Sequence, residues 1–297
     1  MRNKRQSAEK LMQRIFFSIA GASIAILFLI MVFLFMEGLP IFGVVSVGDF
    51  LFGHYWYPTS DPPDFGIFPL IIASVSVTAL SSVFAIPLGV MTAIYLAELA
   101  SKRVAEIVKP TVELLAALPS VVIGFFGMVV VAPFLQDVFD IPTGLNLFNS
   151  ALMLAFMSIP TICSLSEDAI YSVSPGLKEG SLALGATRWE TILRVILPAS
   201  ISGISTAVIL GMSRAIGETM VVLMVAGGAG MIPESIFSPV RPLPASIAAE
   251  MAEAPFRGDH YYALFAIGIV LFVFTLLFNL VADFIAHKYR QVGEASL

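Results

Sequence analysis

The sequence predicts an all-α polytopic membrane protein with six transmembrane helices. Of its 297 residues, 58% are hydrophobic and 12% are charged, whereas a soluble domain has about 25% charged residues. A hydrocarbon core of about 30 Å requires about 20 apolar residues in each helix, since every backbone polar group must be satisfied within the span. Six such stretches occur, at about 15–36, 67–97, 111–135, 149–166, 202–226 and 262–286.

The first stretch is longer than the apolar core of a signal peptide, and it lacks an A-x-A-like cleavage site. We therefore expect a retained anchor helix. Together with the outer loop that follows, it makes up an N-terminal segment, residues 1–66, ahead of a transmembrane domain at residues 67–290.

Basic residues are distributed unevenly among the loops, and this predicts the orientation because cytoplasmic flanks retain Lys and Arg during insertion. With the N-terminus inside, only Arg241 and Arg257 lie outside, and Arg214 lies within the fifth span. The remaining basic residues are cytoplasmic: Arg2, Lys4, Arg5, Lys10, Arg14, Lys102, Arg103, Lys109, Lys178, Arg188, Arg194, Lys288 and Arg290. We therefore predict that both termini are cytoplasmic.

Metal and disulfide chemistry have little support in the sequence. The single cysteine, Cys163, lies in the fourth span and cannot form an internal disulfide, so we expect it to pack in the interior. His54, His260 and His287 have no metal-ligand spacing. We expect neither a metal nor a cofactor in this chain.

The largest cytoplasmic loop, about residues 167–201, contains the run EGSLALGATRWETILRVILPA. Residues 180–187 match the phosphate-binding pattern G-x-x-x-x-G-K-[ST] except that Ala186 replaces the lysine. That pattern requires a preceding strand, a following helix and the lysine, and none is evident here. We expect instead a short helix, about 175–184, that ends at Gly185, and a second helix, ATRWETILRVIL, that is closed by Pro198.

This loop has an apolar side that must be buried against something. It comprises Leu182, Leu184, Trp189, Ile192, Leu193 and Ile196. A loop of about 35 residues is too small to form a core alone. It is therefore interpreted as a docking element, with packing on its own membrane helices as the alternative.

The same run resembles the E-A-A...G.........I.LP loop of permease subunits of ATP-binding-cassette (ABC) importers. Glu179, Gly185 and Pro198 occupy matching places, whereas Gly180 and Ser181 replace the alanines of the motif. The resemblance implies a type I importer permease fold, in which the loop's short helix inserts into a cleft on a separate ATPase subunit. The implied coupling residues are Glu179, Gly180, Ser181, Leu182, Ala183, Leu184, Gly185 and Ala186.

Two further stretches resemble the third and fifth spans of the PstC-type permeases of phosphate importers: KPTVELLAALPSVVIGFFG, residues 109–127, and SRAIGETMVVLMVAGG, residues 213–228. Met220 favours this type over the sister PstA type. The resemblance implies a sister permease (PstA type), a homodimeric ATPase (PstB type) that binds ATP and Mg, and an extracytoplasmic phosphate-binding protein (PstS type). The chain itself is then a transport subunit and not an enzyme.

A candidate transport pathway contains Arg214, about 18 Å into the fifth span if that helix enters near residue 202. A charge there costs about 2.5–3.5 kcal/mol on insertion scales. Glu218 is four residues on, so we expect an ion pair on one helix face, either attracting and releasing phosphate or only locking the helices. Ser213, Thr219 and Ser120 are candidate hydrogen-bond donors, and the resemblance adds Glu113, expected at the start of the third span.

Prolines and glycines interrupt two spans, Pro87 and Gly89 in the second and Pro119, Gly124 and Gly127 in the third. They suit either bendable gating helices or close helix packing. In the outer loop, residues 245–254 are expected to form a helix with Glu250 and Glu253 exposed. This helix would either face the binding protein or be simply solvated.

Three other functions remain open from sequence. They are import of another oxyanion such as sulfate or molybdate, proton-coupled secondary transport with Arg214 and Glu218 as a relay, and a membrane scaffold or sensor whose loop binds a signalling partner.

Overall fold

The computed structural model describes the backbone of residues 2–294 and the side chains of residues 10–281, 283 and 284. Some residues used in the sequence analysis have side chains outside this set: Arg2, Lys4, Arg5, His287, Lys288 and Arg290. The orientation of both termini stays a prediction.

Six helical segments of the described residues are long and apolar enough to cross a membrane. They are Lys10–Gly43, Phe68–Leu99, Ser120–Phe139, Leu147–Tyr171, Arg188–Ile216 and Asp259–Val281. The prediction of six spans is therefore confirmed. A hairpin of two short strands, β1 (Trp56–Tyr57) and β2 (Asp64–Phe65), lies in the loop before the second span, so the chain is not entirely helical.

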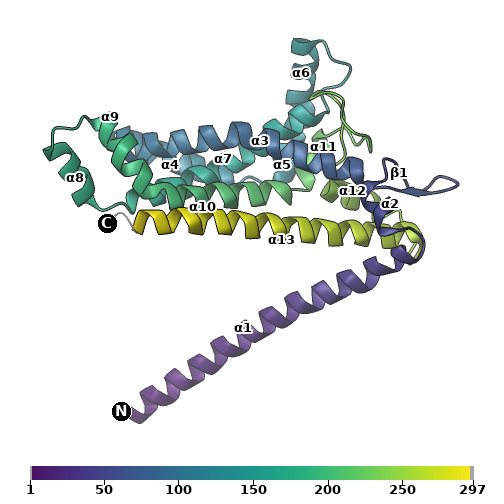
Figure 1. Cartoon of the computed structure of the whole chain (residues 1–297), viewed down its shortest axis with the longest axis horizontal. Coiled ribbons are helices and arrows are strands. Elements are labelled where there is room, and N and C mark those ends of the chain that lie inside the picture. The colour runs from purple at the N-terminus through teal and green to yellow at the C-terminus, as the bar shows by residue number, and fades with distance from the viewer. Residues whose placement is uncertain (1, 295–297) are drawn as a thin grey trace.

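Four long helices lie side by side in the centre of the molecule (Figure 1). They are α3 (Phe68–Ile94), α7 (Leu147–Tyr171), α10 (Leu197–Ile216) and α13 (Asp259–Glu294). Buried apolar clusters hold α3, α7 and α10 together, and one of them contains Ala85, Ala155 and Ile162. Cys163 of α7 is fully buried among these helices, as expected for a packing role.

The first helix, α1 (Arg2–Gly38), diverges from this group and approaches it only near its own C-terminal end (Figure 1). There a Cβ atom on Gly38 would lie 2.6 Å from Cδ1 of Ile269 on α13. None of its most apolar 18-residue window is buried within the chain. This helix therefore leaves its apolar surface to lipid or to another subunit.

The two ends of the bundle carry different elements (Figure 1). The short helices α8 (Pro175–Ala183) and α9 (Arg188–Thr191) lie at one end. At the other end, η1 (Leu39–Gly43), α2 (Val47–Phe52), the hairpin and α12 (Leu243–Glu250) surround the start of α13. A second apolar cluster, which includes Phe50, Trp56 and Leu264, holds this end together.

Glycines mark the closest helix contacts. A Cβ atom on Gly89 would lie 2.8 Å from Cγ2 of Ile162, and one on Gly211 would lie 2.5 Å from Cγ1 of the same residue. A Cβ atom on Gly127 would lie 2.7 Å from Cγ1 of Val225. No side chain fits at such distances, so these glycines support the close-packing interpretation. Pro87 lies inside α3, which stays continuous.

The third span begins later than predicted. Helix α4 (Lys102–Ala116) ends before Pro119, and a new helix starts with α5 (Ser120–Phe126), which continues through the π-helical turn η3 (Gly127–Val131) into α6 (Ala132–Phe139). Proline has no backbone N–H and disfavours helical geometry in the residue before it, so Pro119 separates α4 from α5. The predicted span 111–135 is therefore wrong at its start, and Glu113 lies on a separate helix.

The fifth span differs from its predicted bounds, 202–226, at both ends. The helix α9, the π-helical turn η4 (Ile192–Ile196) and α10 form one continuous segment, so Pro198 does not close the second loop helix as predicted. In the π turn the Leu197 N–H bonds to the Ile192 carbonyl, five residues back, and this wider turn accommodates the proline ring. The predicted span 202–226 divides at Gly217, after which α11 (Met220–Val225) begins.

Candidate functional site

Arg214 lies near the end of α10 with its side chain exposed on the surface of the isolated chain. Its Nη1 atom is 3.5 Å from Oγ1 of Thr161 on α7. Thr161 precedes the end of α7 at Tyr171 by ten residues, which is about 15 Å along the helix. That depth is about half of a 30 Å core. An arginine facing lipid there is costly, so its exposure indicates a second subunit or an aqueous path beside it.

The predicted ion pair between Arg214 and Glu218 is not formed between these two described side chains. Oε1 of Glu218 instead accepts hydrogen bonds from the backbone N–H groups of Met220, at 3.2 Å, and Val221, at 3.3 Å. An i, i+4 pair requires a continuous helix, but helix α10 ends at Ile216, before Glu218 is reached. The carboxylate therefore caps the free amides at the start of α11.

The candidate hydroxyl donors have different partners. Thr219 Oγ1 donates to the Gly217 carbonyl at 3.4 Å, and Ser213 Oγ donates to Oδ1 of Asn279 on α13 at 2.6 Å. Ser120 is the first residue of α5. Helix α5 and the turn η3 run in the same direction as α11, because Gly124 of α5 faces Val221 and Gly127 of η3 faces Val225. Ser120 and Glu218 consequently lie at the same level, where both interrupted spans restart.

Glu113 is exposed on α4 and belongs to a different set of contacts. On the same helix, Nζ of Lys109 is 3.3 Å from Oε2 of Glu167 and 3.9 Å from Oδ1 of Asp168, both on α7. Burial by itself lowers the pKa of Lys109, but the hydrogen bond and charge of Glu167, with the charges of Asp168 and Glu113, outweigh it and raise the pKa above its ordinary value. These contacts tie α4 to the end of α7.

For the loop at residues 167–201, the prediction is correct in its first helix, in the turn and in the start of its second helix, but that second helix does not end at Pro198. Helix α8 ends at Ala183, and Gly185 has a φ of +88°, in the region that glycine adopts without steric cost. Thr187 then caps α9. Its hydroxyl accepts from the Glu190 N–H, while the Glu190 carboxylate accepts from the Thr187 N–H at 2.9 Å, which is a complete capping box.

The apolar side chains of the loop fall into two groups. Ile192 and Ile196 are 1% and 2% exposed and pack with α3 and α7. Leu184 is 92% exposed and Trp189 is 58% exposed, and Leu182 and Leu193 are exposed as well. The alternative that the loop packs on its own membrane helices therefore holds for the first group only. The run 180–187 begins inside helix α8, and no strand precedes it among the described residues of this loop, so the geometry does not fit a nucleotide-binding loop.

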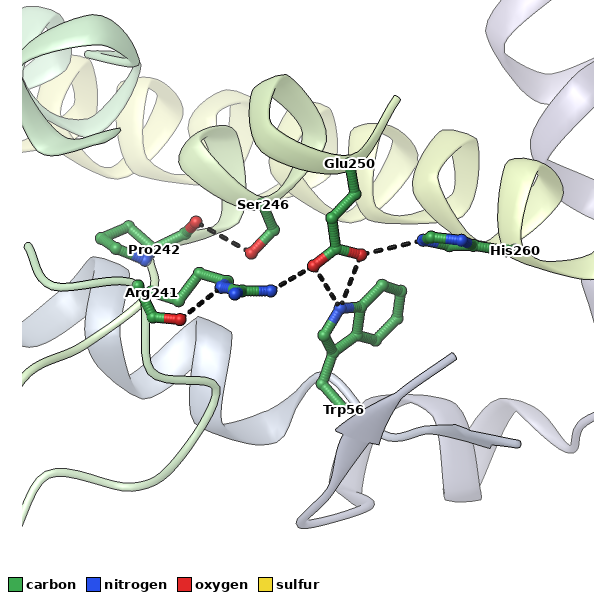
Figure 2. A network of polar contacts seen from close by, with 7 residues as sticks. Trp56, Arg241, Pro242, Ser246, Glu250 and His260 are labelled. Carbon is green, nitrogen blue, oxygen red and sulfur yellow. Dashed lines mark hydrogen bonds and ion pairs between the residues drawn. The ribbon is translucent and has the colours of Figure 1, made fainter. Parts of the chain in front are cut away.

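A polar network at the opposite end of the bundle was missed from sequence (Figure 2). Both carboxylate oxygens of Glu250 are 3.1 Å from Nε1 of Trp56, Oε2 is 2.8 Å from Nε2 of His260, and Oε1 pairs with Arg241. The side chain of Glu250 is 14% exposed, so the prediction that it is exposed was wrong, whereas Glu253 is exposed as predicted.

This network borders a cavity of about 480 Å³ that Tyr57, Glu253 and residues 228–231 also line. No spacing rule could find it, since Trp56 and Glu250 are 194 positions apart. The helix predicted at 245–254 ends at Glu250.

Comparison with known proteins places this geometry in a family. Residues 85–291 match the family described as binding-protein-dependent transport system inner membrane component. The probable ABC transporter permease protein YqgH of Bacillus subtilis is 39% identical over 272 residues, which cover 91% of this chain and 87% of that protein. The phosphate transport system permease protein PstC of Mesorhizobium japonicum is 36% identical over 256 residues, which cover 80% of this chain and 77% of that protein.

Solved structures share the fold at low identity. The bacterial alginate ABC transporter, in complex with an alginate-bound periplasmic protein, matches with a TM-score of 0.64 at 19% identity and covers 94% of this chain and 95% of that chain. The MetNI methionine ABC transporter matches with a TM-score of 0.59 at 19% identity, and the match covers 73% of this chain and 93% of that chain. The fold is thus that of a type I ABC importer permease, and the chain belongs to the binding-protein-dependent transport system inner membrane component family.

Proposed function

We propose that this chain is a permease subunit of an ATP-driven importer of inorganic phosphate and that it forms the pathway together with a sister permease. The PstC-type names of several relatives support the cargo. The observation that carries the proposal is Arg214, a cation that is exposed on the chain surface at mid-membrane depth and bonded to one neutral hydroxyl. A guanidinium in that position attracts a phosphate and binds it through paired N–H donors.

Besides Arg214, the proposed pathway includes the region of the molecule where helices α5 and α11 begin. Ser120 and Thr219 contribute neutral donors there, and the Glu218 carboxylate repels a dianion, which keeps binding weak enough for release. Protonated phosphate can also donate a hydrogen bond to Glu218, whereas sulfate cannot. Glu113 lies apart on α4, and we assign it to the α4–α7 contact rather than to this part of the pathway.

The loop Glu179–Ala186 is proposed to dock into a homodimeric ATPase of the PstB type, which binds ATP and Mg. Its support is the pair of strongly exposed side chains Leu184 and Trp189 beside a preformed turn at Gly185. A PstS-type binding protein would deliver phosphate to the opposite end, and a PstA-type sister permease would cover Arg214. In this arrangement both termini face the cytoplasm.

The test is uptake of radiolabelled phosphate by cells that carry the complete importer with Arg214→Gln, Arg214→Lys or the control Arg103→Gln, whose parent residue is exposed on α4. We expect ATP-dependent uptake to be lost in Arg214→Gln, partly retained in Arg214→Lys and unchanged in the control. Equal membrane levels of all variants exclude an assembly defect. Normal uptake by Arg214→Gln would make the charge structural and refute the proposed pathway.

Two further measurements distinguish this proposal from the other functions. Competition with sulfate and molybdate identifies the cargo. Uptake that survives ATP depletion but not an uncoupler would establish a proton-coupled transporter instead, and the absence of any uptake would favour a scaffold or sensor.

A further inference from the structure

Glu98 is a buried carboxylate that the proposed pathway does not use. It lies in the π-helical turn η2 (Tyr95–Leu99) that ends the second span, and 9% of its surface is exposed. Directly after it the chain leaves the helix, with the Ala100 N–H bonded to the Tyr95 carbonyl at 2.7 Å. Glu98 therefore lies at the end of the second span, on the side of the molecule that carries α8 and α9.

The two helices of the loop, α8 and α9, both contact Glu98. Lys178 of α8 forms an ion pair with Oε2 of Glu98, and Arg188 at the start of α9 donates a hydrogen bond to the Glu98 backbone carbonyl. These two basic residues flank the turn at Gly185, seven positions from it on one side and three on the other. The two helices are also joined to each other, since Ser181 Oγ lies 3.0 Å from Oγ1 of Thr191.

Helix α8 has few other attachments to the membrane helices. None of its residues is buried, whereas η4, which follows α9, is anchored through Ile192 and Ile196. A buried carboxylate without a partner is strongly unfavourable, so the charge of Glu98 stays compensated only while Lys178, and with it α8, remains in place. The position of α8 and the end of α3 are thus linked by one charge pair.

We propose that Glu98 is a positioning residue that joins the docking helix α8 to the end of the second span, so that movement of α8 by the ATPase is transmitted to α3. This inference rests on the proposed function of the loop as the ATPase docking element. Without the pair, the ATPase would still bind the exposed face of α8 and hydrolyse ATP, but α3 would respond less to its closure.

The experiment uses the complete importer with its binding protein, reconstituted in vesicles, and measures phosphate uptake and ATP hydrolysis on the same preparation. The variants are Glu98→Gln, Lys178→Met and the exchanged pair Glu98→Lys with Lys178→Glu. Glu106→Gln is the control, because Glu106 is an exposed acid on the adjacent helix α4. We expect several-fold less phosphate imported per ATP hydrolysed in both single variants, with ATPase binding retained, and recovery of the ratio in the exchanged pair.

The opposing results are distinct. An unchanged ratio in Glu98→Gln and Lys178→Met, or a proportional fall in uptake and hydrolysis, would overturn the inference and leave the pair as a stabilising contact. Uncoupling without any recovery in the exchanged pair would also overturn it. Lack of ATP-dependent uptake by the unmodified complex would refute the proposed function itself, and this inference with it.

Discussion

Replacing Gly185 by alanine should weaken binding of the ATPase subunit without disturbing the membrane helices. The φ of +88° at this position costs a residue with a Cβ atom about 1–2 kcal/mol. A Cβ atom there would meet no heavy atom within 4 Å, so the whole cost is conformational. Since about 1.4 kcal/mol is tenfold in an equilibrium constant, the apparent affinity should fall about five- to thirtyfold if the ATPase binds only the native turn.

The loop provides its own control in Gly180. It is exposed, and an added Cβ atom would likewise meet nothing within 4 Å. However, it lies in the middle of α8, where alanine is better than glycine by about 1 kcal/mol. Gly180→Ala should therefore bind the ATPase as well as the unmodified loop or better, and Gly185→Asn should be intermediate because asparagine tolerates the left-handed region.

The assay is the equilibrium affinity of the purified ATPase subunit for the permease pair in lipid nanodiscs, with the melting temperature of each variant as a check on folding. Equal affinities for Gly185→Ala and Gly180→Ala would refute the reasoning, because they would show that the left-handed turn is not the bound conformation.

Three further outcomes are expected. Glu250→Gln should lower the melting temperature, corresponding to about 1.5–3 kcal/mol for losing hydrogen bonds to a charged group in a partly buried network, whereas Glu253→Gln should leave it unchanged; equal melting temperatures would show that the network contributes nothing. Glu218→Gln should narrow the preference for phosphate over sulfate in uptake assays, and unchanged discrimination would remove Glu218 from selectivity. Because the pKa of Lys109 is raised in the folded state, its contribution to stability is complete below its unfolded pKa and is lost as the pH rises through the folded value. The difference in melting temperature between the native protein and Lys109→Gln should thus be constant near neutral pH and shrink above about pH 10. A difference that grows above about pH 10 would show that folding does not raise the pKa of Lys109.

The number of spans and the loop turn follow from local sequence, and both were predicted correctly. An apolar run of about 20 residues has one stable conformation in a bilayer, so the number of spans could be read directly. The turn at Gly185 is equally local, because only glycine adopts its backbone geometry without cost. The same local reasoning failed where helices break inside an apolar stretch, at Pro119 and Gly217, since composition does not reveal which proline or glycine interrupts a helix.

Partners across the fold were decided only by tertiary structure. Spacing alone paired Arg214 with Glu218, but the break at Gly217 turns that carboxylate to the amides of α11 instead. The contacts of Glu250 with Trp56, and of Glu98 with Lys178, join residues far apart in sequence, and no periodic pattern encodes such pairs. The sequence by itself thus determined which segments cross the membrane and where the loop turns, because these depend on hydrophobicity and backbone sterics over a few residues. The tertiary structure decided which charges are compensated, because that depends on which helix ends the packing brings together.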